Sequence, residues 1–399
     1  MVTLSNRITL LAESETLAMA RKSRELKAEG KDVINLSLGE PDFNTPDYIK
    51  EAAKAAIDQN YSFYPPVAGY GDLRETICFK LQRDNQLVYK SDQIVVSTGA
   101  KQSIANAVLS LVNPGDEVIL PAPYWVSYKE IIKVAEGKMV AIPTSIRQEF
   151  KLTPGQLTSA ITPKTRLMIF SSPCNPTGSV YSREELYGLA QVLSHYPDIY
   201  VIADEIYEHI NFIGKHQSIA QFDFIKERVI LINGVSKGFA MTGWRLGYLA
   251  APKEIAQACD KLQGQFTSAA CSIAQRAALA ALATSPDTPE LKHMLQAFRE
   301  RRDLLLEMLA KIPGFQLNHP DGAFYLFPDI SAYFGKSDGT NMINNSNDLC
   351  MYLLNNATVA LVPGDAFGDP NCVRFSYATS KDKLIAAVDR ISERLAQLK

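Results

Sequence analysis

A lysine at the end of an apolar run is the residue of this sequence whose position says most about chemistry. Lys237 lies in Ser236-Lys237-Gly238-Phe239-Ala240, shortly after the apolar run Val229 to Ile232, and Arg245 follows eight positions later. An amine at the end of a buried strand can form an imine with an aldehyde, while a nearby arginine holds an anion. Taken alone, Ser-Lys-Gly is more typical of a solvated lysine, because lysine side chains are mostly exposed.

A second strand end carries a carboxylate. The apolar run Tyr200 to Ala203 leads into Asp204-Glu205-Ile206-Tyr207. A carboxylate there can keep a pyridine nitrogen protonated, and a protonated ring absorbs the electrons of a substrate carbanion. The lysine, arginine and aspartate together therefore indicate a pyridoxal phosphate site. Alone, Asp204 fits a helix cap as well; Tyr207 can reach the ring hydroxyl, but alone it fits a packed tyrosine.

Two loops and a tryptophan add candidate contacts. Ser97-Thr98-Gly99-Ala100-Lys101-Gln102 turns from a strand into a helix, so its backbone N–H groups can bind a phosphate, although many tight turns share this pattern. The rigid loop Ser172-Pro173-Cys174-Asn175-Pro176-Thr177-Gly178 presents Asn175, whose amide can donate to a ring oxygen. Cys174 has no apparent histidine partner that would make it a nucleophile. Trp125 can stack on a flat ring or pack in the core.

Composition excludes several classes of protein. The 399 residues exceed what one core usually supports, and 46% hydrophobic with 21% charged residues is typical of a soluble globular protein. A net charge of −2 favours neither nucleic acid nor an anionic membrane as partner. The six scattered cysteines indicate free thiols, and the five histidines show no metal-ligand spacing. Because Glu13 and Glu15 interrupt the apolar N-terminal stretch, we expect no signal peptide or membrane span, and a cytoplasmic protein.

Strand-like runs alternate with helical patterns over most of the chain. This alternation predicts a mostly parallel α/β sheet with ligands at the carboxyl ends of its strands. The expected strands are Ile94 to Ser97, Glu117 to Leu120, Arg166 to Phe170, Ile199 to Ala203, Val229 to Ile232 and Arg245 to Ala250. Later in the chain we expect a helix over Leu291 to Leu309, strands within Ala323 to Phe327, Thr358 to Val362 and Cys372 to Tyr377, and a last helix from Lys381. We therefore predict a large domain, 45–289, and a smaller α+β domain made of 1–44 and 290–399.

Six motifs in this order resemble the class I aminotransferases of the aspartate aminotransferase family, which are fold-type I pyridoxal phosphate enzymes. They are Leu38-Gly39-Glu40-Pro41-Asp42-Phe43, Tyr61-Ser62-Phe63-Tyr64, Asn175-Pro176-Thr177-Gly178, Asp204-Glu205-Ile206-Tyr207, the Lys237 segment and Cys372-Val373-Arg374-Phe375-Ser376-Tyr377-Ala378. The resemblance covers nearly the whole chain. It implies a ping-pong reaction in which L-aspartate and 2-oxoglutarate give oxaloacetate and L-glutamate, with amino acids and 2-oxo acids as the small-molecule partners.

The resemblance assigns contacts to the cofactor ring. It implies that Lys237 holds pyridoxal phosphate covalently and, once displaced, moves the substrate's proton. Asp204 then contacts the ring nitrogen, Tyr207 and Asn175 contact the ring hydroxyl, and Trp125 stacks on the ring.

A second set of residues is implied for the phosphate. Arg245 and the turn Gly99-Ala100-Lys101 bind it, together with the partner subunit's Tyr64, which implies a homodimer with shared active sites. Many relatives carry a hydroxyl residue three positions before the lysine, where this chain has Gly234. Ser236, next to the lysine, is the candidate replacement.

For the substrate, the resemblance implies that Arg374 binds the α-carboxylate, with Asn175, Trp125 and the Gly39 backbone nearby. A fork of donors is the geometry a carboxylate needs, although an arginine in such a place can also be purely structural.

Three further residues resemble those of the bacterial and plant-like subgroup that uses dicarboxylates. Lys101 corresponds to a lysine that helps to bind the distal carboxylate, and Ser14 and Thr16 to the segment that closes over it. Members that also use prephenate tend to carry a basic residue shortly before that serine. Here Leu11, Ala12 and Glu13 stand there, so prephenate is disfavoured.

Other functions share these motifs. An alanine, aromatic or broad-specificity transaminase, a carbon–sulfur lyase or a cyclopropane-forming synthase can use the same cofactor contacts, because fold does not settle reaction. A cofactor-sensing regulator would need an added DNA-binding module, and no basic recognition helix is apparent.

Overall fold

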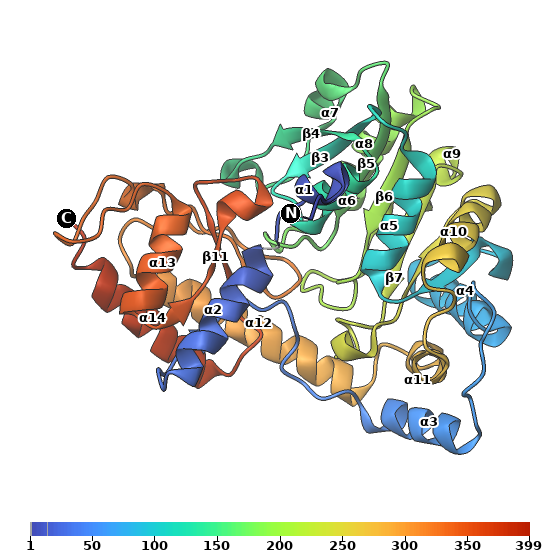
Figure 1. Ribbon diagram of the computed structural model, residues 1–399, viewed down its shortest axis with the longest axis horizontal. Coiled ribbons are helices and arrows are strands. Elements are labelled where there is room, and N and C mark those ends of the chain that lie inside the picture. The colour runs from blue at the N-terminus through green and yellow to red at the C-terminus, as the bar shows by residue number, and fades with distance from the viewer. Residues whose placement is uncertain (1, 14) are drawn as a thin grey trace.

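The chain folds into two lobes, each around its own hydrophobic core. Figure 1 shows the computed structural model, which describes residues 2–13 and 15–399. The larger lobe holds a seven-stranded sheet, and the C-terminus lies at the outer end of the smaller lobe. Helix α12 (Pro289–Leu309) connects them, because Leu291 packs in the core of the larger lobe and Met294 in that of the smaller lobe.

The large sheet is mostly parallel. Its strand order is β2-β8-β7-β6-β5-β3-β4, and only β8 runs antiparallel to its neighbours. The strands are β2 (Ile94–Ser97), β3 (Glu117–Ala122), β4 (Lys138–Pro143), β5 (Thr165–Ser171), β6 (Tyr200–Asp204), β7 (Val229–Gly234) and β8 (Gly247–Ala250). The predicted fold class is confirmed.

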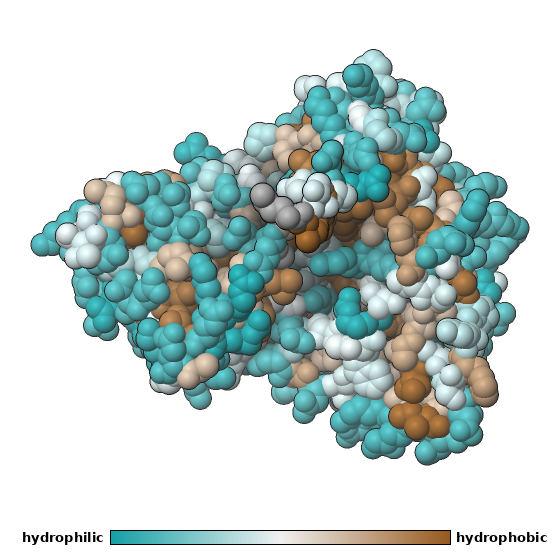
Figure 2. Space-filling model, in the orientation of Figure 1, coloured by the Kyte–Doolittle hydropathy of each residue, from teal (hydrophilic) through white to brown (hydrophobic). Residues whose placement is uncertain are grey.

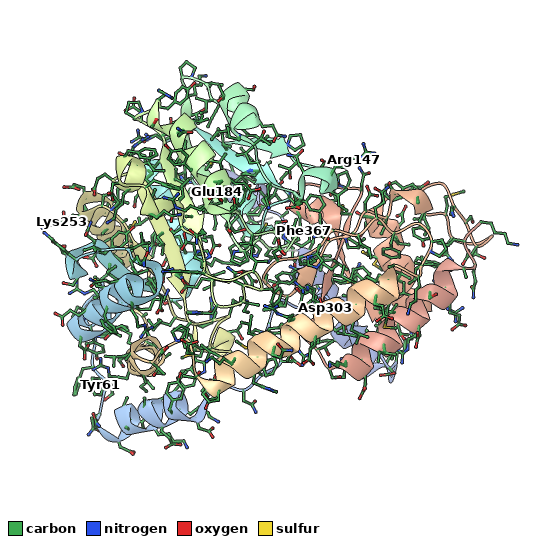
Figure 3. All side chains as sticks on the ribbon, turned by 180° about the vertical axis from the view of Figure 1, so that it is seen from behind. Tyr61, Arg147, Glu184, Lys253, Asp303 and Phe367 are labelled. Carbon is green, nitrogen blue, oxygen red and sulfur yellow. The ribbon has the colours of Figure 1, made fainter. Side chains whose placement is uncertain are left out.

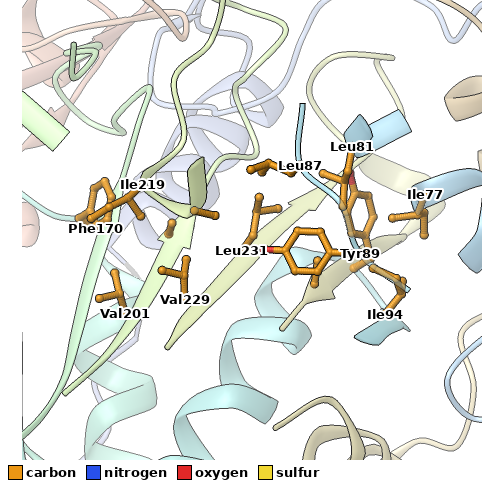
Figure 4. Packing of buried hydrophobic residues seen from close by; sticks show 14 of the residues in the cluster. Ile77, Leu81, Leu87, Tyr89, Ile94, Phe170, Val201, Ile219, Val229 and Leu231 are labelled. Carbon is orange, nitrogen blue, oxygen red and sulfur yellow. The ribbon is translucent and has the colours of Figure 1, made fainter. Parts of the chain in front are cut away.

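Helices cover both faces of this sheet. They are α4 (Gly71–Asn85), α5 (Ala100–Leu111), α6 (Ser127–Val134), α7 (Pro154–Ala160), α8 (Arg183–Ser194), α9 (Asp223–Lys226), α10 (Lys253–Phe266) and α11 (Ser272–Ala283). Helix α3 (Asp47–Asp58) packs on α11 at the outer tip of the lobe (Figure 1). Val201 and Val229 face the core shared with α4, α8 and α11, which Figure 4 shows from close by, whereas Ile202 and Ile230 face the core shared with α5, α6 and α10. Because both faces are buried, these strands form nearly continuous apolar runs in the sequence.

The smaller lobe combines segments from both ends of the chain. It contains α2 (Glu15–Ala28), α13 (Ser346–Asn356), α14 (Lys381–Leu395), the parallel pair β1 (Ile34–Asn35) and β10 (Val359–Ala360), and the antiparallel sheet of β11 (Val362–Pro363), β12 (Val373–Ser376) and β9 (Tyr325–Leu326). The first helix, α1 (Asn6–Thr9), lies beside α6 of the larger lobe instead (Figure 1). Although α1 belongs to the N-terminal part of the chain, its Arg7 is paired with Glu136 of the larger lobe at 2.9 Å. The domain boundaries at residues 45 and 290 stay a prediction.

The observed strands differ from the expected ones in several places. Arg245 is not in a strand, because its φ of 54° is left-handed and β8 begins at Gly247. The run Thr358 to Val362 splits into β10 and β11, which pair with different partners. The strand β4 was not expected, since it lies at the sheet edge and most of its side chains are exposed, which leaves a weak apolar pattern.

No helix in the described part of the chain is both long enough and apolar enough to cross a membrane. All six cysteines are free thiols. Cys174 is buried, and burial raises the pKa of its thiol, which disfavours the reactive thiolate.

Candidate active site

A cavity of about 330 Å³ opens where the carboxyl ends of β5, β6 and β7 meet the smaller lobe. Figure 2 shows this region as a hollow between the lobes. The predicted site residues that line it are Thr16, Gly39, Ala100, Lys101, Trp125, Asn175, Asp204, Tyr207, Ser236, Lys237, Arg245 and Arg374. These residues come from segments far apart in sequence, so the fold brings together nearly all of the predicted set.

Lys237 follows β7 and reaches into this cavity. Its Nζ donates to the carbonyl oxygen of Gly39 at 2.5 Å and lies 5.8 Å from the ring centroid of Tyr207. Burial lowers the pKa of Lys237 to about 8; the charge of Glu40 opposes this effect, and that of Arg374 adds to it. A lysine with a lowered pKa has more free amine near neutral pH, and only the free amine attacks a carbonyl carbon.

Gly234, three positions before Lys237, has no space for a side chain. A Cβ there would lie 2.8 Å from Gly247 Cα and 2.9 Å from Leu246 O, because β7 and β8 are in close contact at this point. Ser236 is 5% exposed and lines the cavity, which is where the predicted replacement hydroxyl should be.

Asp204 ends β6 and is 5% exposed. Its Oδ2 accepts a hydrogen bond from Tyr128 Oη at 2.6 Å, and its Oδ1 accepts one from Ile206 N at 3.3 Å. Burial raises the pKa of Asp204 to about 6, and both hydrogen bonds oppose that rise. A buried carboxylate in such a place gains strongly from a cationic partner in the cavity.

Beside it, an anion site is built on the N-terminus of α5. The cap residue Gly99 has φ 84°, and the N–H groups of Ala100 and Lys101 make no hydrogen bond within the described residues. A side chain at position 99 would collide with the guanidinium of Arg245, so this cation lies directly against the turn. Burial lowers the pKa of Lys101, and the positive Arg245 lowers it further. Two cations at an open helix N-terminus form a phosphate site in chemical terms.

Arg374, on β12, is 1% exposed and makes no ion pair with a carboxylate of the described residues. Its NH1 donates to Asn175 Oδ1 at 2.9 Å and its NH2 to Ser37 O at 2.5 Å, while Nε has no partner. Its guanidinium lies 5.0 Å from the ring of Phe367, which Figure 3 places where the lobes meet. A buried cation with an unpaired donor calls for an anionic ligand.

Two predicted aromatic contacts also border the cavity. Trp125 is partly buried, and its ring lies 5.0 Å from Lys101 Nζ and is in edge contact with Tyr128. Tyr207 is buried, and its hydroxyl is 2.8 Å from that of Tyr325. The amide nitrogen of Asn175 makes no hydrogen bond within the described residues, so it is available to a ligand.

One predicted contact is not part of this arrangement. Tyr64 is 97% exposed and does not line the cavity of its own subunit. Figure 3 shows Tyr61, three residues before it, at the outer tip of the larger lobe, away from the junction. Ser14 lies outside the described residues.

Sequence reasoning missed Tyr128, Tyr325 and Ser37. Tyr128 lies three residues after Trp125 and contacts its ring, so this helix-like spacing was the available signal. Tyr325 stands inside an expected strand with nothing to mark it as polar and functional, and Ser37 acts through its backbone carbonyl.

A family model described as aminotransferase class I and II matches residues 31–391. The chain belongs to this family. A bifunctional aspartate aminotransferase and glutamate/aspartate-prephenate aminotransferase of Petunia hybrida is 50% identical, over 100% of this chain and 84% of the relative. Family members of this class typically use pyridoxal phosphate.

Solved structures of the family have the same fold. An aspartate aminotransferase from Rhizobium meliloti matches with a TM-score of 0.96 and 41% identity, covering 100% of both chains. One from Thermus thermophilus, solved with maleate, matches with a TM-score of 0.92 and 38% identity, covering 99% of this chain and 100% of the other. The Petunia relative's name includes prephenate, so this comparison does not support the expectation against that substrate.

Proposed function

We propose that this aminotransferase transfers the amino group of L-aspartate to 2-oxoglutarate, with pyridoxal phosphate as cofactor. The observation that carries the proposal is the buried Arg374, which lacks an anionic partner and faces the same cavity as Lys237. An amine for the cofactor's aldehyde and a fork of donors for a carboxylate are what the first step on an α-amino acid needs. Relatives named as aspartate aminotransferases support the choice of substrate.

The residues present fit pyridoxal phosphate. The open N-terminus of α5 with Arg245 suits the phosphate, and Asp204 suits the ring nitrogen. Tyr207 and the amide nitrogen of Asn175 can both donate to the ring's phenolic oxygen. Bound there, the cofactor supplies an electron sink for the carbanion formed at the substrate's Cα.

Three residues of the chain have separate roles in this reaction. Arg374 holds the α-carboxylate in a fixed orientation, and Asn175 and Ser37 hold Arg374. Asp204 stabilises positive charge at the ring nitrogen from a buried position. Lys237, with its lowered pKa, would take the proton from the substrate's Cα and deliver it to the cofactor carbon C4′, and Gly39 O provides an acceptor that keeps the amine close by.

Specificity for a dicarboxylate is part of the same proposal. Lys101 and Thr16 both line the cavity. Lys101 is the stronger candidate for binding a distal carboxylate, because it is a cation and its Nζ lies 5.0 Å from the ring of Trp125, which also lines the cavity. The competing role for Lys101 is the phosphate, which Arg245 and the helix terminus also serve. Prephenate is the second candidate substrate, because the Petunia relative carries it in its name.

Steady-state kinetics test the function. Parallel double-reciprocal lines for aspartate and 2-oxoglutarate are the expected result, since the cofactor carries the amino group between two half-reactions. A panel of aspartate, alanine, tyrosine, phenylalanine and prephenate ranks the donors and acceptors. Release of pyruvate and ammonia from a single amino acid, with no need for an acceptor, would instead identify a lyase.

We also infer a homodimer whose active sites are shared. Tyr64 is 97% exposed, and its neighbours Phe63 and Ile57 are 80% and 59% exposed. Figure 2 shows hydrophobic side chains gathered over α3 at this tip of the larger lobe. Such an apolar surface suits a second copy of the chain, whose cavity would then receive Tyr64.

Subunit hybrids test this sharing. Lys237→Ala and Tyr64→Ala are mixed, dissociated in mild denaturant and reassociated. If Tyr64 acts in the neighbour's site, one site of each hybrid regains a native Lys237 and a native Tyr64, so activity rises above that of either variant alone. No gain in hybrids proved by mass to be mixed would exclude the sharing.

A further inference from the structure

We propose that Tyr325 is a positioning residue that links occupation of Arg374 by a substrate carboxylate to the hydroxyl of Tyr207. The link joins the small lobe's β9, which carries Tyr325, to the turn after β6, which carries Tyr207. The inference rests on the proposed function for the identity of the two ligands, a carboxylate at Arg374 and the cofactor's phenolic oxygen at Tyr207.

Tyr325 contacts both residues from a fully buried position. Its side chain is 0% exposed. Its hydroxyl is 2.8 Å from that of Tyr207, and the two rings meet edge to face at 5.8 Å. On its other side, the guanidinium carbon of Arg374 lies 4.6 Å from the centroid of the Tyr325 ring, within the range of a cation–π interaction.

The same hydroxyl also packs on the backbone that holds the lysine. A Cβ at position 39 would collide with Tyr325 Oη, which explains why glycine stands there. Gly39 O in turn accepts the hydrogen bond from Lys237 Nζ at 2.5 Å. Tyr325 is therefore in contact with the tyrosine, the arginine and the loop that surround the reacting lysine.

The two hydroxyls share one hydrogen bond, so only one of them donates in it. Either hydroxyl can be the donor. Burial raises the pKa of both tyrosines, and the charge of Arg374 opposes that rise in both. When Tyr325 donates, the proton of Tyr207 is free for another acceptor in the cavity. A carboxylate on Arg374 offsets the positive charge, which weakens Tyr325 as a donor and, through the shared bond, weakens Tyr207 as a donor.

Other ionisable groups face this pair and share its environment. They are Arg374 on β12, Asp204 on β6, Lys237 after β7 and Tyr377 after β12. Glu40, in the loop after β1, acts on Lys237. None of them lies between the two hydroxyls, so removing the Tyr325 hydroxyl breaks this connection while the charges stay in place.

The experiment follows the absorbance of lysine-bound pyridoxal phosphate as pH is raised, with and without succinate, a dicarboxylate that carries no amino group. In the wild-type protein, bound succinate should raise the midpoint of this titration, because Tyr207 then donates less to the phenolic oxygen and the protonated form is favoured. In Tyr325→Phe the rise should fall by at least half, while the dissociation constant of succinate changes less than threefold. Tyr377→Phe is the matched control: it removes a buried hydroxyl whose recorded bond is to Ala323 O at 3.3 Å, and should keep the full rise.

A second measurement distinguishes loss of the link between the two hydroxyls from a general change in the structure of the variant. In a Tyr207→Phe background the receiving hydroxyl is missing, so adding Tyr325→Phe should change the midpoint no further. An equal rise in Tyr325→Phe and wild type, or a further change in the double variant, would overturn the proposal. Failure of the wild-type protein to bind pyridoxal phosphate would instead contradict the proposed function, which separates the two failures.

Discussion

Asp204→Asn should make the cofactor-free protein more stable at alkaline pH, and it should abolish the catalysis of the protein loaded with pyridoxal phosphate. In the folded chain, burial raises the pKa of this carboxyl from an ordinary 3.8 to about 6. A raised pKa in the folded state means that the folded chain holds the proton more tightly than the unfolded chain. The resulting stability is complete below about pH 4 and is lost as pH rises through about 6.

The size of the loss follows from the same shift. At about 1.4 kcal/mol per pKa unit, moving from 3.8 to about 6 costs about 3 kcal/mol of unfolding free energy in the ionised state. Asparagine cannot ionise and keeps an oxygen to accept the bond from Tyr128. The free energy of unfolding of Asp204→Asn, relative to wild type, should therefore rise by about 3 kcal/mol between about pH 4 and pH 8.

Urea unfolding of both cofactor-free proteins across this pH range measures the difference in their unfolding free energies directly. The other titrating groups are the same in both proteins, so their contributions cancel in this difference. Asp47→Asn is the control: Asp47 is exposed and bonded to Lys50, which lowers its pKa, so its pH trend should be small and of opposite sign. Pyridoxal phosphate should stabilise the wild type more than Asp204→Asn at pH 8, since a protonated ring nitrogen would be the missing partner. A stability difference that does not vary with pH would refute the reasoning.

Three further predictions concern the cavity. Arg374→Lys replaces a fork by a point charge and should lower kcat/KM for aspartate about 10- to 100-fold, measured with the cofactor saturating, because bonds to Asn175 and to the carboxylate are lost. Lys101→Ala should lower kcat/KM for aspartate by a factor that corresponds to about 1.5 to 3 kcal/mol of transition-state stabilisation, and should leave kcat/KM for alanine nearly unchanged. Equal losses for both donors would assign Lys101 to the phosphate instead. Tyr128→Phe removes the 2.6 Å donor to Asp204 and should raise that pKa above 6 in the cofactor-free protein, so the pH range over which Tyr128→Phe loses stability relative to Tyr128→Phe/Asp204→Asn should lie above the wild-type range; an unchanged range would mean that Tyr128 does not act on this carboxyl.

Local sequence patterns were enough to find the residues that stand at strand ends. Lys237 and Asp204 each follow an apolar run, and parallel strands bring their carboxyl ends to one edge, so their meeting could be expected. The fold class followed from the same alternation of strands and helices. Arg374 needed the resemblance, because a buried arginine in a short strand has no local pattern that separates binding from structure.

The remaining parts of the site depend on distances that sequence does not encode locally. The Tyr128–Asp204 bond joins residues 76 positions apart, and the Tyr207–Tyr325 bond joins residues 118 apart. Arg245 was expected within a strand because its neighbours are apolar, but its left-handed backbone follows from the turn before β8. The role of Tyr64 concerns a second subunit, so it stays a prediction.

A single-turnover experiment tests the central claim most directly. The protein loaded with pyridoxal phosphate is mixed with excess L-aspartate in the absence of any 2-oxo acid. We expect one equivalent of oxaloacetate per subunit, loss of the lysine-bound cofactor's absorbance, and its return on adding 2-oxoglutarate; Lys237→Ala should do none of this. Release of ammonia, continued turnover without an acceptor, or an unchanged spectrum would contradict the assignment.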